Sequence, residues 1–294
     1  MPVRLGISPI GWSNDDLPEL GGDTPLETCL AEARLAGFEG IELGNKFPRD
    51  PVVLRPILER QGLSLISGWY SGRLLARSVT EELAAIEAHR ALLVAMGCAV
   101  LVYAETSGSI AGDRCRPLSS RLRLGDDDWH DFGGRLTELA ERLLQCGIRL
   151  AYHHHVGTVV ESEAEIDRLM AVTGDSVGLL LDTGHLAFAG ADPTILARRY
   201  GHRIAHVHCK DVRRDILASV RAGDASFLDA VLDGVFTVPG DGCIDFGGVL
   251  AALAVADYSG WLVVEAEQDP TKAPPLAYAR LGFGHLSAAA RAGL

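Results

Sequence analysis

Residues 139–155 read LAERLLQCGIRLAYHHH, and this stretch contains the pattern that decides the fold. A helical run ends at Gly147, and the apolar segment that follows it ends in three histidines. Glycine adopts the left-handed conformation at the end of a helix at little cost, so Gly147 predicts a helix terminus. The short, almost continuous apolar segment behind it is typical of a buried parallel strand.

The same order of helix, break and strand recurs along the chain. Glycines in the position of Gly147 predict further helix ends at Gly37, Gly62 and Gly97. VRLGIS (3–8) supplies a first strand. The other copies of the pattern lie at 31–43, 58–69, 92–103, 175–185, 198–208 and 254–267. Eight strands alternating with helices predict a closed (β/α)8 TIM barrel, an α/β fold. An open nucleotide-binding sheet is disfavoured, because SPIGWSND follows the first strand without a G-x-G-x-x-G turn.

The chain has 294 residues, and no interdomain linker stands out, so we expect one barrel domain over residues 1–294. Two connections are long, at 104–128 and at 211–247. Connections of this length are usually functional lids or disordered segments. Both follow strands, which places them at the C-terminal face where barrel active sites are built.

Composition narrows the class of protein. Hydrophobic residues make up 48% and charged residues 22%, which is ordinary for a globular protein. The net charge of −12 argues against a nucleic-acid partner, because such binding depends on basic side chains. Six cysteines without paired short spacing fit reduced thiols in the cytoplasm. No secretory leader and no apolar run of about 20 residues is found, so we expect no membrane association.

Acidic and histidine side chains gather at the predicted strand ends. Each of them alone is more often a helix cap or a satisfied core residue. In a barrel, however, all strand ends meet at one mouth, where clustered carboxylates and imidazoles need a positive charge among them. A divalent ion with mixed oxygen and nitrogen ligands satisfies the set; Mn or Co is favoured, and Mg or Zn also fits. The residues concerned are Glu42, His153, His154, His155, Asp182, His185, His208, Glu265 and Glu267.

These motifs carry a family resemblance over nearly the whole chain. The spacing of Asp182-Thr-Gly-His185, His206-Val-His208 and Glu265 resembles the xylose-isomerase-like TIM barrels. Within that group, LLLDTGHLAFAG (179–190) and GWLVVEAEQDP (260–270) are most similar to the inosose dehydratases of myo-inositol catabolism. The resemblance implies that Asp182, His208 and Glu265 are metal ligands and that His185 contacts substrate beside the metal.

The fourth ligand departs from the family pattern. Relatives usually have a glutamate at the end of the fifth strand, and His153 aligns with it here. His155 and Glu161 are alternatives, although strand alternation places His153 and His155 on the same face. The change also removes a glutamate that epimerases use as an acid or base, which favours a dehydratase.

The implied reaction is loss of water from a small polyhydroxylated cyclic ketone, 2-keto-myo-inositol, to give a trihydroxycyclohexane dione. A metal would polarise the ketone, and separate groups would remove one proton and protonate the departing hydroxyl. Trp69 and Tyr70 end the third strand and are either rim packing or a wall for the substrate ring. Lys46 and Glu42 are expected to hold hydroxyl groups or to share proton transfers. The catalytic candidates are His155, His185, Lys210 and Glu42.

Other functions make different demands. A metal-dependent ketose isomerase or epimerase on the same fold would need two bases on opposite faces of its substrate, or a hydride path. A sugar-sensing barrel would bind its ligand without metal. A nuclease is least favoured, since a chain with net charge −12 offers no basic DNA-binding face. The resemblance is also compatible with assembly into a homo-oligomer.

Overall fold

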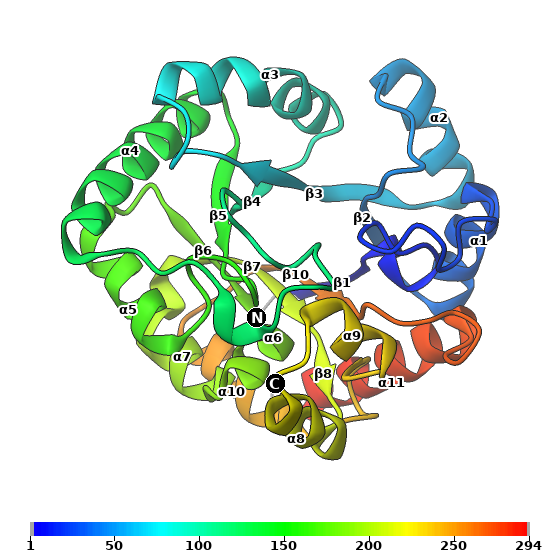
Figure 1. The fold of residues 1–294 in the computed structure, drawn as a ribbon. Helices are drawn as coiled ribbons and strands as arrows, with labels where there is room; N and C mark the ends of the chain where they lie inside the picture. The colour runs from blue at the N-terminus through cyan, green and yellow to red at the C-terminus, as the bar shows by residue number, and fades with distance from the viewer. Residues whose placement is uncertain (1–2, 293–294) are drawn as a thin grey trace.

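The computed structural model describes residues 3–292, and eight parallel strands at its centre close into a barrel. The order around the barrel is β1-β10-β7-β6-β5-β4-β3-β2, and β2 pairs with β1 to close it. Figure 1 shows the strands surrounded by a ring of helices. The predicted TIM barrel is confirmed. Its strands are β1 (Val3–Ile7), β2 (Gly40–Leu43), β3 (Ser64–Gly72), β4 (Val100–Glu105), β5 (Arg149–His153), β6 (Gly178–Asp182), β7 (Ile204–Cys209) and β10 (Gly260–Val264).

The outer helices follow the strands as the repeat predicts. The helices are α1 (Leu26–Ala36), α2 (Pro51–Gln61), α3 (Val79–Ala95), α4 (Asp126–Gln145), α5 (Glu163–Val172), α6 (Thr183–Ala189), α7 (Pro193–Tyr200), α10 (Phe246–Val255) and α11 (Pro275–Ala292). The glycines predicted to follow helix ends all have positive φ, from 65° at Gly62 to 112° at Gly37. At Gly37 an added Cβ would also lie 2.6 Å from the Phe283 ring, so both conformation and packing require glycine there.

The prediction of one domain over 1–294 stays a prediction, since residues 1, 2, 293 and 294 lie outside the described range. No helix of the described chain combines the length and apolar character that a membrane span needs.

The connection at 211–247 differs from the expected long loop or disordered segment. It contains β8 (Asp211–Val212) and β9 (Phe236–Thr237), which pair antiparallel, and helices α8 (Arg214–Gly223) and α9 (Phe227–Leu232). The reason is a small core of its own, in which Phe227, Val231 and Phe236 are buried. Burial of aromatic and aliphatic side chains stabilises an ordered excursion from the barrel.

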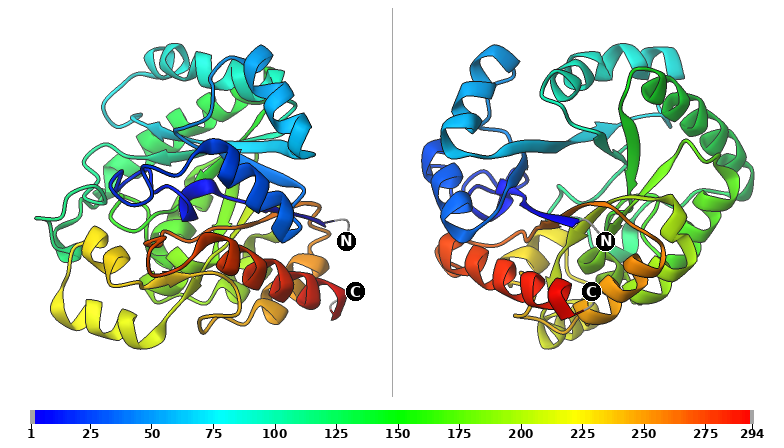
Figure 2. Two further views of the ribbon diagram at one scale, coloured as in Figure 1. Left: turned by 90° about the vertical axis from the view of Figure 1, so that its right-hand side faces the viewer. Right: turned by 180° about the vertical axis from the view of Figure 1, so that it is seen from behind.

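The two long connections meet at one end of the molecule. In the side view of Figure 2, the 106–125 connection and α8–α9 lie at the end opposite both termini. Arg114 pairs with Asp229 at 2.6 Å, and the Ser119 amide donates to the Asp224 carboxylate at 3.0 Å. The amide of Leu118 donates to the Ala225 carbonyl at 3.2 Å. These contacts attach the first connection to the second at the C-terminal end of the barrel.

Candidate metal centre

Four side chains at the ends of adjacent strands form the centre of the site. His153 ends β5, Asp182 ends β6, His208 lies on β7, and Glu265 directly follows β10. In the sheet Asp182 is in register with His208, and His208 is in register with Val263. Since β5, β6, β7 and β10 are consecutive neighbours in the barrel, their C-terminal ends present these side chains to one point.

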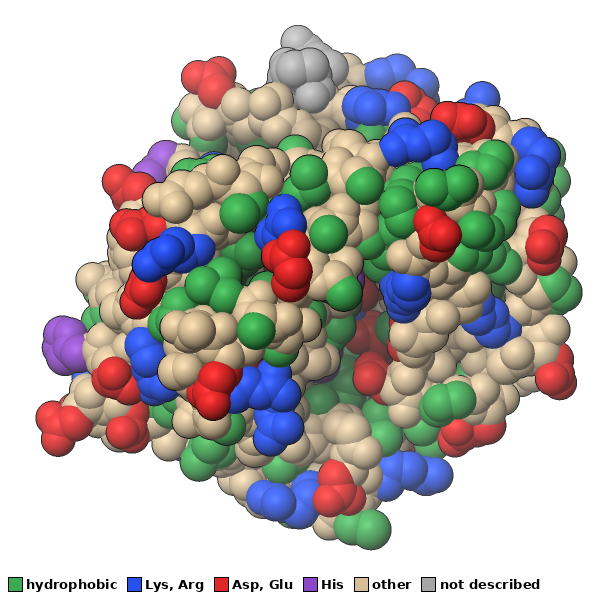
Figure 3. Space-filling model, turned by 90° about the horizontal axis from the view of Figure 1, so that it is seen from above, with side chains coloured by type: hydrophobic (Ala, Val, Ile, Leu, Met, Phe, Trp, Pro, Cys, Tyr) green, Lys and Arg blue, Asp and Glu red, His purple; other side chains and the backbone are tan. Residues whose placement is uncertain are grey.

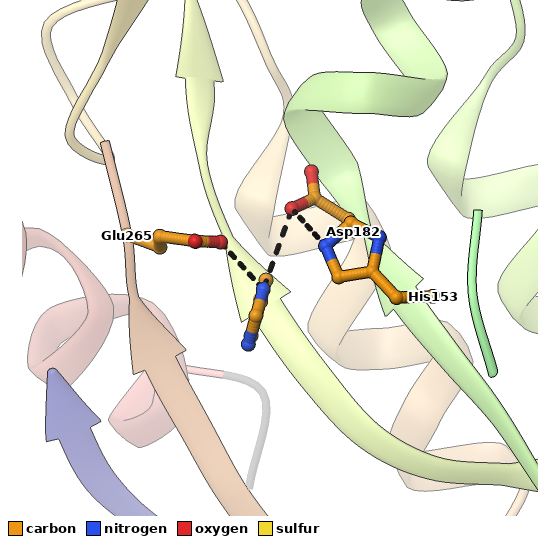
Figure 4. Close-up of side chains that lie close together, drawn as sticks. His153, Asp182 and Glu265 are labelled. Carbon is orange, nitrogen blue, oxygen red and sulfur yellow. Dashed lines mark ion pairs between the residues drawn. The ribbon is translucent and has the colours of Figure 1, made fainter. Parts of the chain in front are cut away.

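The ligating atoms are close together. His208 Nδ1 lies 2.5 Å from Glu265 Oε2 and 3.5 Å from Asp182 Oδ2. His153 Nε2 lies 3.5 Å from the same Asp182 oxygen. Figure 4 shows His153, Asp182 and Glu265 pointing inward from separate strands. His153, Asp182 and His208 are buried, and Glu265 is nearly so.

The donor set fits a divalent ion. Within the described chain, Asp182 Oδ2, His208 Nδ1 and Glu265 Oε2 are buried without a hydrogen-bond partner, and buried polar atoms rarely lack one. Atoms that share an ion at about 2.0–2.2 Å lie roughly 3–3.6 Å apart. The two 3.5 Å separations, from Asp182 Oδ2 to His208 Nδ1 and to His153 Nε2, fall in this range. The 2.5 Å separation between His208 Nδ1 and Glu265 Oε2 would widen to admit an ion. A metal would therefore satisfy all three unpaired atoms at once.

Of the three candidates for the fourth ligand, His153 is the one that the structure brings into this cluster. Glu161 pairs with Arg121 at 3.2 Å and accepts from the Gly157 amide at 2.8 Å, away from the centre. His155 stands against His185, with 3.9 Å between ring centres. The Nδ1 atom of His153 is 2.7 Å from the His154 carbonyl, so it carries the proton and leaves Nε2 free to bind a metal.

Lys210 supplies positive charge directly behind the cluster. Its ammonium is fully buried, 2.8 Å from Glu267 Oε1, 3.6 Å from Asp182 and 3.5 Å from Glu265. Burial alone would lower the Lys210 pKa, but the three carboxylates outweigh it and raise the pKa above its usual range. This is the opposite direction from the lowered pKa that a catalytic base would use.

The two other histidine candidates form a second group beside Lys210. Burial first, and then neighbouring positive groups, hold the pKa values of His155 and His185 well below the usual range, so both rings are neutral. His185 is 3.0 Å from Lys210 Nζ and fully buried. His155 Nδ1 lies 2.7 Å from the Val156 carbonyl, which leaves its Nε2 as an acceptor.

A cavity of about 450 Å³ opens onto this centre. Its walls include His153, His208 and Glu265 from the metal cluster, together with His155 and Glu267. Asp182, His185 and Lys210 lie behind this wall. Seen from above, the space-filling view shows a hollow with acidic side chains on its wall (Figure 3). The cavity is large enough for a six-carbon ring compound.

Of the three predicted substrate-binding residues, Trp69 lines the cavity and Tyr70 and Lys46 do not. Trp69 lines the cavity and stands edge-on to the rings of His153 and His155, at 5.3 and 5.6 Å. Tyr70, the next residue of β3, points to the other side and stacks on Tyr103 at 6.0 Å, so it belongs to the packing. The Lys46 ammonium is used for structure: it donates to the carbonyls of residues 21, 22 and 24 at 3.1, 2.7 and 2.5 Å. The structure thus does not bring Tyr70 or Lys46 to the cavity.

Glu42 lines the cavity, as expected of a residue near the substrate, but its carboxylate also bonds to two histidines. It lies within β2 and is buried, and it accepts hydrogen bonds from His206 and His208. Burial acts to raise the Glu42 pKa, but the charge of His208 and these hydrogen bonds outweigh burial and hold the pKa well below its usual range.

Two carboxylates of the cavity escaped the sequence analysis. Asp15 and Asp16, in the GWSNDD segment after β1, line its wall. Partial enclosure by the cavity, and then the charge of Glu267, raise the pKa of Asp16 to about 6, although part of its surface remains open to solvent. The only sequence signal was an acidic pair in the connection after a strand, which turns also commonly contain.

Comparison with known proteins agrees with this architecture. The chain is 54% identical over 293 residues to the rhizopine catabolism protein MocC of Rhizobium meliloti, covering 99% of this chain and 90% of that one. It is 47% identical over 279 residues to inosose dehydratase of Geobacillus thermodenitrificans, covering 94% of each. Among solved structures, the IOLI protein with a bound zinc atom superposes with a TM-score of 0.71 at 16% identity, covering 99% of both chains, and shares the fold.

The family model for the xylose isomerase-like TIM barrel matches residues 30–289. That range includes seven of the eight barrel strands and all four side chains of the cluster. The chain therefore belongs to the xylose isomerase-like TIM barrel family.

Proposed function

We propose that this protein is a metal-dependent inosose dehydratase, a hydro-lyase that removes water from 2-keto-myo-inositol to give a trihydroxycyclohexane-1,2-dione. The observation that carries the proposal is identity of 44–47% to several inosose dehydratases over at least 94% of this chain. The cavity supports it, because its wall joins a carboxylate–imidazole cluster to a free imidazole and a carboxylate.

His153, Asp182, His208 and Glu265 would hold the metal, which polarises the substrate ketone when bound. Two imidazoles and two carboxylates suit Mn or Co, and Mg and Zn are the alternatives. Elemental analysis of the purified protein distinguishes these ions. His185 and Lys210 lie behind this group, and the Lys210 ammonium holds the Glu267 carboxylate in place on the cavity wall by a 2.8 Å hydrogen bond.

The proton transfers are assigned to groups that reach the cavity. His155 presents Nε2 as an acceptor on the cavity wall, which places it to take the proton beside the ketone. The departing hydroxyl then takes a proton, and Asp15, Asp16, Glu42 and Glu267 are carboxylates on the wall that could supply it. His185 and Lys210 would act through Glu267, because both are buried behind it. Trp69 would bound the face of the substrate ring.

The test is direct. Protein loaded with Mn or Co is incubated with 2-keto-myo-inositol, and dione formation is followed by its ultraviolet absorbance. We expect turnover that chelation abolishes and that Asp182→Asn reduces by several orders of magnitude. Absence of dione together with interconversion of a ketohexose would instead establish the isomerase or epimerase. Tight binding of the inosose to chelated protein without turnover would establish a sugar sensor.

The cellular setting is also a proposal. All six cysteines lie in the described part of the chain as free thiols, which supports a reducing cytoplasm. The substrate class implies a small-molecule partner, without nucleic acid or membrane. A homo-oligomer stays a prediction, and light scattering of the purified protein measures it.

A further inference from the structure

Glu42 reaches across the barrel to the face of His208 that lies away from the metal cluster. The two residues belong to β2 and β7, which are separated in the barrel by β1 and β10. One oxygen, Glu42 Oε1, lies 3.1 Å from His208 Nε2, 3.0 Å from His206 Nε2 and 2.5 Å from Ser67 Oγ. All four side chains are buried.

This contact determines which nitrogen of His208 carries the proton. Glu42 Oε1 accepts the hydroxyl proton of Ser67, so His208 Nε2 must supply the proton of its own bond with that oxygen. In the neutral ring that metal binding would require, the lone pair is then on Nδ1, the atom that faces Glu265 at 2.5 Å and Asp182 at 3.5 Å. The orientation of the ring is determined by the same bond.

We propose that Glu42 is a positioning residue that holds His208 in the Nε2-protonated form and aims its Nδ1 lone pair at the centre shared with His153, Asp182 and Glu265. The inference rests on the metal site of the proposed function, and the catalytic role expected for Glu42 from the sequence stays a prediction beside it. Carboxylates that orient a metal-bound imidazole in this way typically contribute ten- to a hundredfold to metal affinity.

His153, the other imidazole of the cluster, has a different hydrogen-bond partner from His208. The Nδ1 atom of the His153 ring is held by the backbone carbonyl of His154, at 2.7 Å, and Glu42 is not among its hydrogen-bond partners. Substitution of Glu42 should therefore disturb one imidazole ligand and leave the other in place.

A merely structural role for this buried carboxylate makes a different prediction. Ser67, on β3, donates to the same Glu42 oxygen but does not contact the cluster. If Glu42 only stabilised the barrel interior, losing the Ser67 bond and losing the carboxylate would both lower stability while leaving metal affinity unchanged. Ser67→Ala is therefore the matched control.

The experiment measures metal binding rather than turnover. Full-length chains with Glu42→Ala, Glu42→Gln or Ser67→Ala are freed of metal by chelation and titrated with Co²⁺, followed by visible absorbance. We expect Ser67→Ala to bind like the unsubstituted chain and Glu42→Ala to bind about ten- to a hundredfold more weakly. Glu42→Gln should fall between them, because its amide oxygen still accepts from Nε2–H. If Glu42→Ala does not fold, the comparison of Glu42→Gln with Ser67→Ala decides, and equal affinities overturn the inference.

Proton NMR of the Co²⁺-loaded chains reads the tautomer itself. Two exchangeable imidazole protons near the ion are expected, on His153 Nδ1 and His208 Nε2. Glu42→Ala should lose the second to rapid exchange and keep the first, whereas Ser67→Ala keeps both. Persistence of both signals in Glu42→Ala, or an unsubstituted chain that binds no Co²⁺, overturns the inference. A Co²⁺-loaded chain that behaves as expected here but forms no dione overturns the proposed reaction alone.

Discussion

At the residue scale, the electrostatics of the site depend on one ammonium. Lys210 is surrounded by Asp182, Glu265 and Glu267, three carboxylates within 3.6 Å of its Nζ. Buried like charges at this distance repel strongly unless an opposite charge compensates them. In the metal-free protein, Lys210 provides that compensation.

Lys210→Met should therefore destabilise the metal-free protein by about 3–5 kcal/mol, since it leaves buried carboxylates uncompensated. Urea unfolding in the presence of chelator measures the loss. Saturating Mn or Co should restore part of it, because the ion supplies positive charge to the same oxygens. Lys272→Met is the control: Lys272 is exposed and donates to the Leu232 carbonyl. Equal losses in the two variants would contradict this account of Lys210.

His154 predicts how stability responds to acid. Burial, followed by the charge of neighbouring groups, lowers its pKa to about 3, from about 6.5 in the unfolded chain. Between pH 3 and pH 6.5 the unfolded chain binds a proton at His154 that the folded chain does not bind. The stability that neutral His154 contributes is therefore fully present above pH 6.5 and is lost as the pH falls toward 3. The slope from this one group is about 1.4 kcal/mol per pH unit.

His154→Gln should reduce the loss of stability between pH 7 and pH 5 by about 2 kcal/mol. Glutamine does not titrate, and its amide oxygen can accept from the Asp182 amide, as His154 Nε2 does at 3.3 Å. Chemical unfolding of chelated protein at the two pH values measures the difference. His202→Gln, at an exposed position, serves as the control, and an unchanged pH dependence in His154→Gln would refute the assignment.

At the scale of the element, helix α4 shows how a helix of the helix–strand repeat ends. Gly147 follows its end with φ of 82°, and Gly134 lies exposed within it. A Cβ added at either glycine would meet no atom within 4 Å. The two positions therefore differ in backbone conformation and not in packing.

Substitution by alanine should act in opposite directions at these positions. Gly147→Ala places a side chain in the left-handed region and should cost about 1 kcal/mol. Gly134→Ala should stabilise by roughly 0.5–1 kcal/mol, because alanine is the better helix former. Thermal unfolding of both variants under the same conditions measures the two shifts, and shifts of the same sign would show that backbone conformation is not the deciding factor.

At the scale of the whole molecule, the barrel joins four separate strands through the metal cluster. An ion held there links β5, β6, β7 and β10 and binds the folded chain only. A ligand of this kind stabilises the native state in proportion to the logarithm of its concentration over its dissociation constant.

Metal removal should therefore lower the unfolding temperature of the whole barrel. At a hundredfold excess over the dissociation constant the ion contributes about 2.7 kcal/mol, which corresponds to roughly 5–10 °C for a chain of this size. Differential scanning calorimetry with chelator, and then with added Mn or Co, measures the shift. Asp182→Asn should show no such dependence, and a metal-dependent shift of full size in that variant would place the ion elsewhere.

The sequence by itself determined the barrel and the strand-end side chains that meet in it. Helix-ending glycines and apolar strands are local signals, and closure of the barrel then brings Asp182, His208, Glu265 and His153 together without further information. The tertiary structure decided what depends on distant partners. The carbonyls of residues 21, 22 and 24 bind the Lys46 ammonium away from the cavity, and side-chain alternation along β3 turns Tyr70 away from it. Asp15 and Asp16 reach the wall through a connection whose path no local pattern specifies. Glu42 is the clearest case, because its partner His208 lies 166 residues away along the chain, and only the closed barrel brings the two into contact.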